Sequence, residues 1–377
     1  MSLSEKAKDL HRNTVVADLH CDTPLQIRRG YEIGERHNHY HIDIPRLKDG
    51  GVDLQVFALF VDAGIDLDKC FLEVENLYNP LISQIEKNKE QIEICKSVTE
   101  FERIKSSNKI SAFLGIENGM AIENDLRKLE YFYEKGVRYM TLSHSKSHDW
   151  CSSSSDEGRD KFGLTDFGRV VVKKMNELGM IVDVSHISVK AFYDVIDTTD
   201  KPIIASHSNA FAICSHDRNL NDEQLRAVAK NGGVVGINFA SHFLSGQFSK
   251  GLKKYFSENS AAKEEMYNSF LATDKTKMDQ DTGYLAQIHK IRNQFESIYP
   301  DLNIIADHID YITNLIGFDH IALGSDYDGI LDPPDGVEDC SKLPNLTAEL
   351  LNRGYNHENL KKILGLNFIR VFKEICD

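Results

Sequence analysis

Carboxylate and imidazole side chains recur in this sequence directly after short apolar runs. The stretch "VVADLHCDTP", residues 15–24, shows the pattern, because its apolar run leads into His20 and Asp22. Residues i and i+2 of a strand point to the same face, so these two side chains could bind one ion from one strand. Asp18 shares their parity, and we expect it to lie one layer deeper and to need a polar partner.

Other apolar runs end in the same kinds of side chain. These residues are Glu117, His144, His186, His207 and Asp326. Histidine nitrogens and carboxylate oxygens are ligands of zinc and similar divalent metals. Together with His20 and Asp22, and without His144, these residues supply three imidazoles and three carboxylates. Six ligands are too many for one tetrahedral ion and fit two ions about 3.5–4 Å apart, with Glu117 as the shared ligand.

Each motif taken alone also has an ordinary explanation. The histidine of "DVSH" or "ASHS" could be a core histidine bonded to backbone, and "GSDYDG" could be a turn or part of a calcium loop. Glu117 could belong to a buried ion pair, although "FLGIENG" offers few polar neighbours. The metal hypothesis depends on the coincidence of these motifs at the ends of runs. For the histidine-rich "HNHYHID" (37–43), a solvated loop is the preferred interpretation.

Eight apolar runs alternate with amphipathic segments along the chain. The runs cover residues 14–22, 52–61, 110–118, 137–144, 179–186, 202–208, 232–239 and 320–327. The helix-like segments cover residues 71–89, 124–135, 165–178, 188–197, 222–230 and 304–316. Thr165 and Asn221 stand where helix N-caps are expected. The alternation predicts an α/β fold, a (β/α)8 TIM barrel whose strand ends converge on one rim, with an open doubly wound sheet as the alternative.

The same pattern predicts the domain organisation. Residues 1–377 are expected to form a single barrel domain. Residues 243–300 interrupt the alternation after the seventh strand, and we expect this insertion at the C-terminal rim. It would be a lid or an oligomer contact, or alternatively a plain surface excursion. Residues 341–376 are expected to form closing helices.

The charge balance limits the partners of the chain. It carries 44 Lys and Arg against 58 Asp and Glu, a net charge of −14, which disfavours nucleic acid and anionic membrane surfaces. No apolar run approaches the length needed to span a bilayer, so no membrane insertion is expected. The polar start, "MSLSEKAKDLHRN", is not a signal peptide. The chain as written is therefore predicted to be cytoplasmic, and a removed export signal would make it periplasmic.

The seven cysteines are scattered and contain no CxxC pair. This pattern suggests neither a thiolate zinc site nor a redox pair. We expect free thiols, with a single bridge between Cys70 and Cys151 as the alternative.

Taken together, the motifs resemble the membrane (renal) dipeptidase family, peptidase family M19. The resemblance rests on "DLHCDTP", "GIENG", "LSHS", "DVSH", "ASHSNA" followed by "DRN", and "GFDHIALGSDYDG", and it runs from about residue 14 to residue 375. It implies an amidohydrolase-like barrel with two zinc ions per chain that hydrolyses small dipeptides and forms a homodimer. The segment 243–300 is longer than the resemblance leads us to expect, which leaves substrate preference open.

The resemblance also implies roles for single residues. His20, Asp22 and Asp326 would hold one zinc ion, His186 and His207 the other, and Glu117 would bridge them. A hydroxide between the ions would attack the peptide bond, and Asp326 would carry a proton from water to the leaving amine. His144 would contact the scissile carbonyl oxygen, and Arg218 would hold the terminal carboxylate. Without the resemblance, Arg218 is better interpreted as a surface residue and His144 as a structural histidine.

Two other functions remain open from the sequence. One is a different amidohydrolase-type barrel that acts on lactones, cyclic amides or phosphotriesters. Many such enzymes bridge their metals with a modified lysine, whereas the run 137–144 ends without one and the run 110–118 supplies Glu117. The other alternative is a metal-binding barrel without catalytic activity.

Overall fold

Nine parallel strands form the centre of the structure, a computed structural model that describes residues 3–37, 39–158, 161–271 and 290–377. The strands are β1 (Ala17–Asp18), β2 (Leu54–Phe60), β3 (Ile92–Ile94), β4 (Ile110–Glu117), β5 (Val137–Thr141), β6 (Ile181–Asp183), β7 (Ile204–Ala205), β8 (Val234–Ile237) and β9 (Ile321–Leu323). Eight of them close into a barrel, because β1 pairs with both β2 and β9, and β2 pairs with β4. The predicted (β/α)8 barrel is confirmed, and the open sheet is excluded.

The ninth strand, β3, lies outside the eightfold alternation and was missed by the sequence analysis. It pairs with the first residues of β4, where Ile92 faces Ile110 and Ile94 faces Ala112. From Leu114 onward, the same edge of β4 pairs with β5. A three-residue strand inside a Glu- and Lys-rich segment gives no periodic signal, so propensity alone could not find it.

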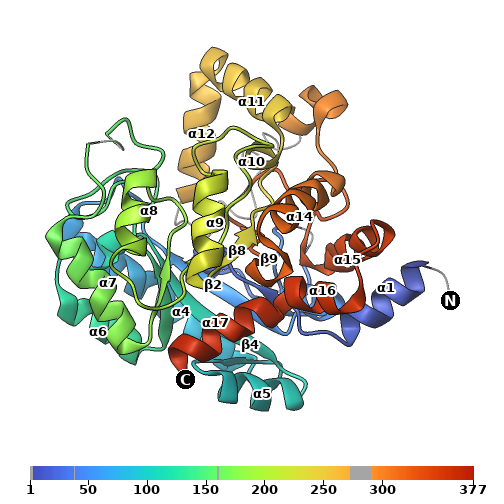
Figure 1. Cartoon of the computed structure of the whole chain (residues 1–377), viewed down its shortest axis with the longest axis horizontal. Helices are drawn as coiled ribbons and strands as arrows, with labels where there is room; N and C mark the ends of the chain where they lie inside the picture. The colour runs from blue at the N-terminus through green and yellow to red at the C-terminus, as the bar shows by residue number, and fades with distance from the viewer. Residues whose placement is uncertain (1–2, 38, 159–160, 272–289) are drawn as a thin grey trace.

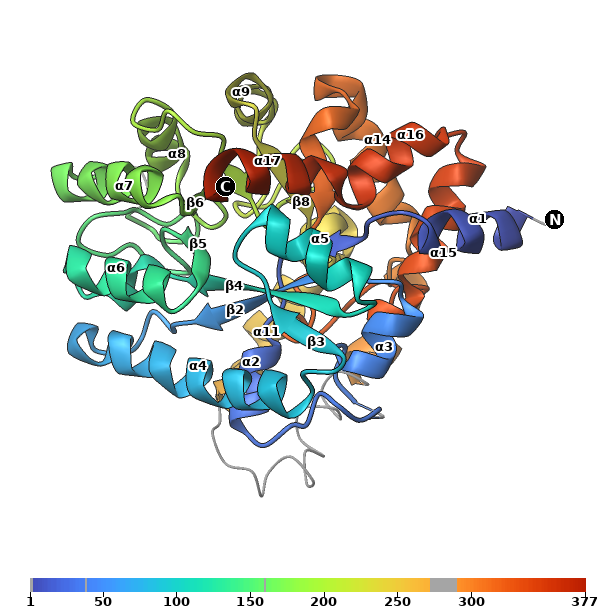
Figure 2. The ribbon, with the colours of Figure 1, turned by 90° about the horizontal axis from the view of Figure 1, so that it is seen from below.

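Helices surround the barrel (Figures 1 and 2). The helices up to β8 are α1 (Leu3–Arg12), α2 (Thr23–Arg28), α3 (Ile44–Asp49), α4 (Cys70–Lys87), α5 (Val98–Ser106), α6 (Leu126–Glu134), α7 (Asp166–Leu178), α8 (Val189–Ile196) and α9 (Asp222–Asn231). Those after β8 are α10 (Ser241–Leu244), α11 (Gly246–Glu258), α12 (Ser260–Leu271), α14 (Asn303–Ile316), α15 (Leu343–Asn352), α16 (His357–Lys361) and α17 (Asn367–Cys376). Both predicted caps are present: Thr165 caps α7, and Asn221 forms a capping box at the start of α9.

The interior of the barrel is apolar at the end opposite the strand C-termini. Phe113 of β4 packs edge-on against Phe368 and Phe372 of α17, with ring centroids 5.6 and 5.0 Å away. Figure 2 shows α17 lying across this end of the molecule. Because aromatic burial of this kind is strongly stabilising, the barrel floor is a rigid base for the opposite rim.

The insertion after β8 is helical in its described part. It includes the end of α10, all of α11 and α12, and the 3-10 helix Glu296–Ile298, and Figure 1 shows α11 and α12 projecting from the body of the molecule. The rest of the predicted insertion includes residues 272–289, which lie outside the described residues. All seven cysteines lie within the described ranges and each is a free thiol, so the alternative bridge between Cys70 and Cys151 is not formed. None of the helices described combines the length and apolar character that a bilayer crossing requires.

Candidate metal centre

The predicted ligands gather at the C-terminal ends of the barrel strands, but most of them lie just beyond the strands. Glu117 is the last residue of β4. His20 and His207 come two residues after β1 and β7, and His186 and Asp326 come three residues after β6 and β9. The runs read from the sequence were therefore too long at this end. Because these residues lie beyond the hydrogen-bonded part of each strand, their backbone can turn each side chain toward the barrel axis.

This shortening corrects the parity argument for the first run. Strand β1 ends at Asp18, and Asp22 is the N-cap residue of α2 with a non-strand backbone. His20 and Asp22 still converge, with His20 Nε2 and Asp22 Oδ2 3.5 Å apart. They meet because the chain turns into α2 after β1, rather than because both belong to one pleated strand.

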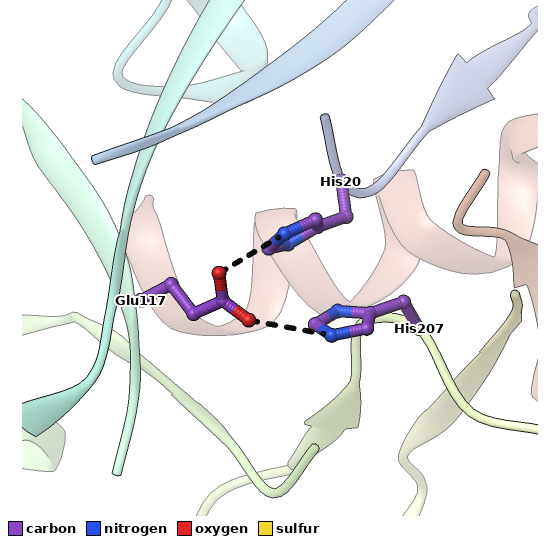
Figure 3. A group of neighbouring side chains, drawn as sticks. All are labelled: His20, Glu117 and His207. Carbon is purple, nitrogen blue, oxygen red and sulfur yellow. Dashed lines mark ion pairs between the residues drawn. The ribbon is translucent and has the colours of Figure 1, made fainter. Parts of the chain in front are cut away.

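Glu117 stands at the centre of the cluster. One of its oxygens, Oε2, lies 3.5 Å from His20 Nε2. The other, Oε1, lies 2.9 Å from His186 Nε2 and 3.4 Å from His207 Nε2. Figure 3 shows the carboxylate between the rings of His20 and His207, with one oxygen facing each ring. The two oxygens of one carboxylate therefore face two separate groups of donors.

The first of these groups is completed by two aspartates. His20, Asp22 and Asp326 each contribute an atom to a set that lies within 4.8 Å, and Asp326 Oδ1 is 4.0 Å from His20 Nε2. The backbone of Gly329 passes close to both carboxylates. A Cβ at this position would lie 2.0 Å from Asp22 Oδ2, so only glycine allows the approach.

The second group contains one residue more than expected. His144 Nε2 lies 3.9 Å from Glu117 Oε1, and Glu117, His144 and His186 form a candidate ligand set of their own. The side chain of His144 is 21% exposed, whereas that of His207 is 1% exposed. His144 is thus the histidine of this group that faces the opening. Its Nδ1 has no hydrogen-bond partner among the described residues, so the structural-histidine interpretation finds no support.

The cluster satisfies the chemical requirements of a metal site. Buried His20 Nε2, Asp22 Oδ1 and His186 Nδ1 have no hydrogen-bond partner within the described ranges. His186 Nε2 and His207 Nε2 are 2.8 Å apart. Buried polar atoms are nearly always paired, so the unpaired Nε2 of His20, which faces Asp22, Glu117 and Asp326, indicates a missing ligand. Nitrogen and carboxylate oxygen donors in this number fit divalent zinc-like ions.

The pKa shifts of several of these residues also indicate a metal site. Burial raises the pKa of Asp326 to about 8, helped by the neighbouring charges of Asp22 and Glu117, and burial raises the pKa of Asp22 to about 6. Burial also lowers the pKa values of His186 and His207 well below the ordinary value, so both are neutral imidazoles. Neutral imidazole is the ligand form of histidine, and crowded buried carboxylates are relieved by a cation.

The pKa of Glu117 is shifted in the opposite direction. Burial alone would raise it, but the surrounding imidazoles of His20, His144 and His186 outweigh burial and hold the pKa of Glu117 well below its usual range. Glu117 is therefore a permanent carboxylate at the point where both donor groups meet. An anion with this position and charge is suited to bind two cations at once.

Residues behind the ligands fix the orientation of the rings. Tyr139 Oη lies 2.9 Å from His20 Nδ1 and donates to the carbonyl of Leu19, so the hydroxyl is placed to accept from Nδ1. The Tyr139 ring has room because the facing residue of β4 is Gly115, where a Cβ would lie 2.3 Å from the ring. This contact directs His20 Nε2 toward the cluster.

A second set of supporting residues serves His207 and Asp326. Ser206 Oγ donates to Asp183 Oδ2 over 2.6 Å and lies 2.8 Å from His207 Nδ1, which holds His207 Nε2 toward Glu117. Asn238 Nδ2 donates to Asp326 Oδ2 over 2.8 Å, which leaves Oδ1 facing the cluster. These supporting residues were not predicted, because a serine, an asparagine or a tyrosine in an apolar run gives no signal of what it contacts.

The backbone is strained at two of the ligands. His186 has φ of 70° and Asp326 has φ of 63°, both in the left-handed region. Non-glycine residues in this region cost roughly 1 kcal/mol or more. The rest of the barrel rim imposes these turns, and they aim the two side chains back across the strand ends.

Arg218 is buried beside the cluster, with 5% exposure, so its interpretation as a surface residue is wrong. Its Nη2 donates to the carbonyl of His207 over 3.1 Å, and its Nε has no hydrogen-bond partner in the described part of the chain. Burial lowers the pKa of Arg218 to about 10, against the opposing charges of Asp326 and Glu117. No ion pair to a described carboxylate completes this cation, so it is available for an anionic ligand.

Asp18 is fully buried and has the partners that it was expected to need, because Ser325 N and Oγ and Gln55 Nε2 all donate to its carboxylate. The described residues of the loop, 37 and 39–43, are partly or fully buried rather than fully solvated. His41 exchanges hydrogen bonds with Asp328, and the His37 ring lies 4.3 Å from the ring of Tyr31. Among the described residues, these loop histidines join no candidate metal group.

A cavity of about 290 Å³ opens onto the cluster. Asp22, Glu117, His144, His186 and Asp326 line its floor, and Phe60, Phe243, Phe256, Ile330 and Leu331 are among its walls. Arg218 instead lines a small adjoining space of about 20 Å³ that also touches His186. We call the larger space the metal cavity. Charged groups at the base of a mostly apolar cavity are typical of a small-molecule active site.

Comparison with protein families now gives this geometry a context. Residues 4–377 match the model of the membrane dipeptidase family, peptidase family M19. The chain belongs to this family. It is therefore a hydrolase of the metal-dependent dipeptidase type, as the resemblance in the sequence had implied.

Several individual proteins are similar to this chain in sequence or in structure. The dipeptidase tcpJ of Claviceps purpurea (strain 20.1) is 30% identical over 349 residues, which cover 89% of this chain and 70% of the relative. The probable dipeptidase PvdM from Pseudomonas aeruginosa has a TM-score of 0.83 at 24% identity, covering 99% of this chain and 98% of PvdM. A metallo peptidase from Rhodobacter sphaeroides, solved with a phosphinate mimic of L-Ala-D-Ala, has a TM-score of 0.78 at 23% identity, covering 96% and 99%. At these identities the solved structures establish the fold.

Proposed function

We propose that this chain is a zinc-dependent dipeptidase with two zinc ions in the cluster, bridged by Glu117. The observation that carries the proposal is the orientation of the Glu117 carboxylate, whose two oxygens face separate donor groups. His20, Asp22 and Asp326 would hold one ion, and His186 and His207 the other. When bound, the ions would supply a hydroxide nucleophile from water and polarise the scissile carbonyl.

Asp326 is the proposed proton carrier. Its Oδ2 is fixed by the hydrogen bond from Asn238, so its Oδ1 is the atom placed to accept a proton and to return it to the leaving amine. A carboxylate at this position can act as a base in one step and, once protonated, as an acid in the next. The two halves of peptide hydrolysis would then use the same atom in turn.

His144 and Arg218 would recognise the substrate. His144 is the partly exposed histidine of the cluster, so its Nε2 is placed to donate a hydrogen bond to the carbonyl oxygen where negative charge develops. Arg218 is a buried cation without a described carboxylate partner, and a guanidinium pairs well with a free C-terminal carboxylate. A carboxylate fixed so near the cluster would restrict substrates to dipeptides.

The experiment is a dipeptide screen on zinc-loaded protein with metal content measured in the same samples. We expect close to two zinc ions per chain and hydrolysis of several dipeptides, with no turnover of lactones or phosphotriesters. Glu117→Gln is the matched control, because it keeps the shape of the side chain and removes the bridging charge. Zinc-loaded protein that cleaves a lactone or phosphotriester but no dipeptide would overturn the proposal. A homodimer remains the expectation for its assembly, and sedimentation measures it.

A further inference from the structure

A second and larger cavity adjoins the metal cavity. Its volume is about 490 Å³, and we call it the side cavity. The two cavities share His242, Phe256, Lys263, Gly329, Ile330 and Leu331 as wall residues. Much of the remaining wall comes from α11, which follows β8 and projects with α12 from the body of the molecule in Figure 1. The insertion thus adds space next to the cluster instead of lying apart from it.

The walls of the side cavity combine apolar surface with unpaired positive charge. Leu252, Phe256, Ile291 and Tyr299 supply apolar surface. Lys253 of α11 and Lys263 of α12 also line it, and neither forms an ion pair with a carboxylate in the described part of the chain.

The described residues that line the side cavity include no free anion to balance these lysines. Asp332 is the one carboxylate among the described residues that line it, and His242 Nδ1 lies 3.0 Å from Asp332 Oδ2. The chain as a whole has a net charge of −14. A locally positive cavity in an acidic protein attracts acidic groups that the overall field repels.

We propose that the side cavity binds a side chain of the substrate and selects one that ends in a carboxylate. The apolar wall would contact the aliphatic part of that side chain, and Lys253 and Lys263 would pair with its acidic end. This inference rests on the proposed dipeptidase function, because the metal cavity must hold the scissile bond. It adds a specificity that the metal cluster does not determine, since every dipeptide presents the same backbone to the ligands.

The test compares glutamate with glutamine in otherwise identical dipeptides. Glu-Ala and Gln-Ala, and Ala-Glu and Ala-Gln, have nearly the same size and differ in one charge. In the wild-type enzyme, we expect kcat/KM for the glutamate member of at least one pair to exceed that of the glutamine member by about tenfold at low salt. The ratio should shrink as salt is added, because the lysines are exposed and their field is screened.

Three lysine variants locate the origin of the preference. Lys253→Glu and Lys263→Glu should each bring the glutamate-to-glutamine ratio toward one or below it. Lys254→Glu is the matched control, because Lys254 neighbours Lys253 on α11, lies 4.0 Å from Glu258 and lines neither cavity. That variant should keep the wild-type ratio.

The possible outcomes separate this inference from the function on which it rests. If no dipeptide is hydrolysed by the zinc-loaded enzyme, the proposed function fails. If dipeptides are hydrolysed but the wild-type ratios are close to one for both pairs, the side cavity does not select acidic side chains. A wild-type preference that persists in Lys253→Glu and Lys263→Glu would also overturn the inference, because other residues would then recognise the carboxylate of the substrate side chain.

Discussion

Buried histidines occur in two different settings in this protein. His308 of α14 is fully buried, and both its ring nitrogens are paired: Nδ1 accepts from Ala210 N over 3.1 Å, and Nε2 donates to Leu244 O over 3.0 Å. His11 is paired in the same way, by Thr347 Oγ1 and Gly50 O, each at 2.7 Å. These histidines fix the positions of helices and are saturated by the chain itself.

The histidines at the barrel rim are not saturated. His20 Nε2 has no hydrogen-bond partner among the described residues, and His186 Nε2 and His207 Nε2 meet beside Glu117. Burial is therefore common to both settings, and the difference is where the ring nitrogens point. Nitrogens that each have a chain partner indicate a structural role, whereas nitrogens that converge on one carboxylate indicate a ligand role.

The strongest test of this contrast is Asp326→Asn. We expect kcat to fall by about 10³-fold or more and zinc content to decrease, because the amide is a poorer ligand and cannot carry the proton. Asp328→Asn is the control, since Asp328 lies two residues away and is more deeply buried than Asp326, but accepts hydrogen bonds from Thr23 and His41. That variant should lose some stability and keep its zinc. If Asp326→Asn retained wild-type turnover, the proposed proton route would be wrong.

The structural setting should be visible in the pH dependence of stability. Burial lowers the pKa of His308 to about 4. Between about pH 6.5 and 4, the unfolded chain binds a proton that the folded chain does not, so stability is full above pH 6.5 and is lost as the pH falls. The loss from this residue should approach about 3 kcal/mol at pH 4.

This effect is isolated by comparing wild type with His308→Gln in chemical unfolding between pH 7.5 and 4.5. Both proteins are kept in chelator, so that metal release does not contribute. The variant should be less stable at pH 7.5 and should lose less stability as the pH falls. Parallel pH profiles for the two proteins would show that His308 is not the group that titrates.

The sequence predicted the barrel and the residues of its cluster, but it predicted neither the spacing nor the supports. Val- and Ile-rich runs between amphipathic helices have few folding solutions, which is why eight strands could be placed. Periodicity could not show that β1 ends at Asp18, because "LHCD" remains compatible with a strand. Asp22 was therefore predicted as a ligand because it would share one face of a strand with His20. The structure does not support that reason.

The supporting residues could not be predicted for a different reason. Tyr139 contacts His20 across the barrel, and Asn238 contacts Asp326 from a neighbouring strand end. Such contacts depend on strand register and on small residues such as Gly115, which makes room for the Tyr139 ring. The walls of the side cavity were equally hard to predict, because the insertion shows only a polar and partly helical pattern in its sequence.

Removing the metal should distinguish the two settings through stability. Zinc at 100 times its dissociation constant should stabilise the folded chain by about 2.7 kcal/mol, because the unfolded chain has no assembled site. Differential scanning calorimetry with zinc and with chelator measures the difference. His308→Gln should keep the zinc-dependent increment, and Glu117→Gln should lose most of it. Equal increments in these two variants would place the zinc outside the cluster.

The contrast between paired and unpaired nitrogens also applies to Arg218, a buried cation whose Nε has no hydrogen-bond partner among the described residues. Arg218→Ala should raise KM for a dipeptide by about 30-fold with a smaller change in kcat, because the variant loses the partner of the terminal carboxylate. The matched substrate is the same dipeptide with an amidated C-terminus. Wild type should prefer the free acid, and Arg218→Ala should treat the two substrates alike. A preference that persisted in the variant would assign carboxylate recognition to another residue.

The smallest effect should come from removing a support rather than a ligand. Tyr139→Phe deletes the hydroxyl beside His20 Nδ1 and leaves the ring in place, so we expect about tenfold weaker zinc binding from a less well oriented imidazole. Thr347→Val is its counterpart in the structural setting, since it removes the hydroxyl beside His11 Nδ1. That variant should lower the free energy of unfolding and leave zinc affinity unchanged. If both variants weakened zinc binding equally, general destabilisation would explain both results. The orientation of the ring nitrogens would then not distinguish ligand histidines from structural ones.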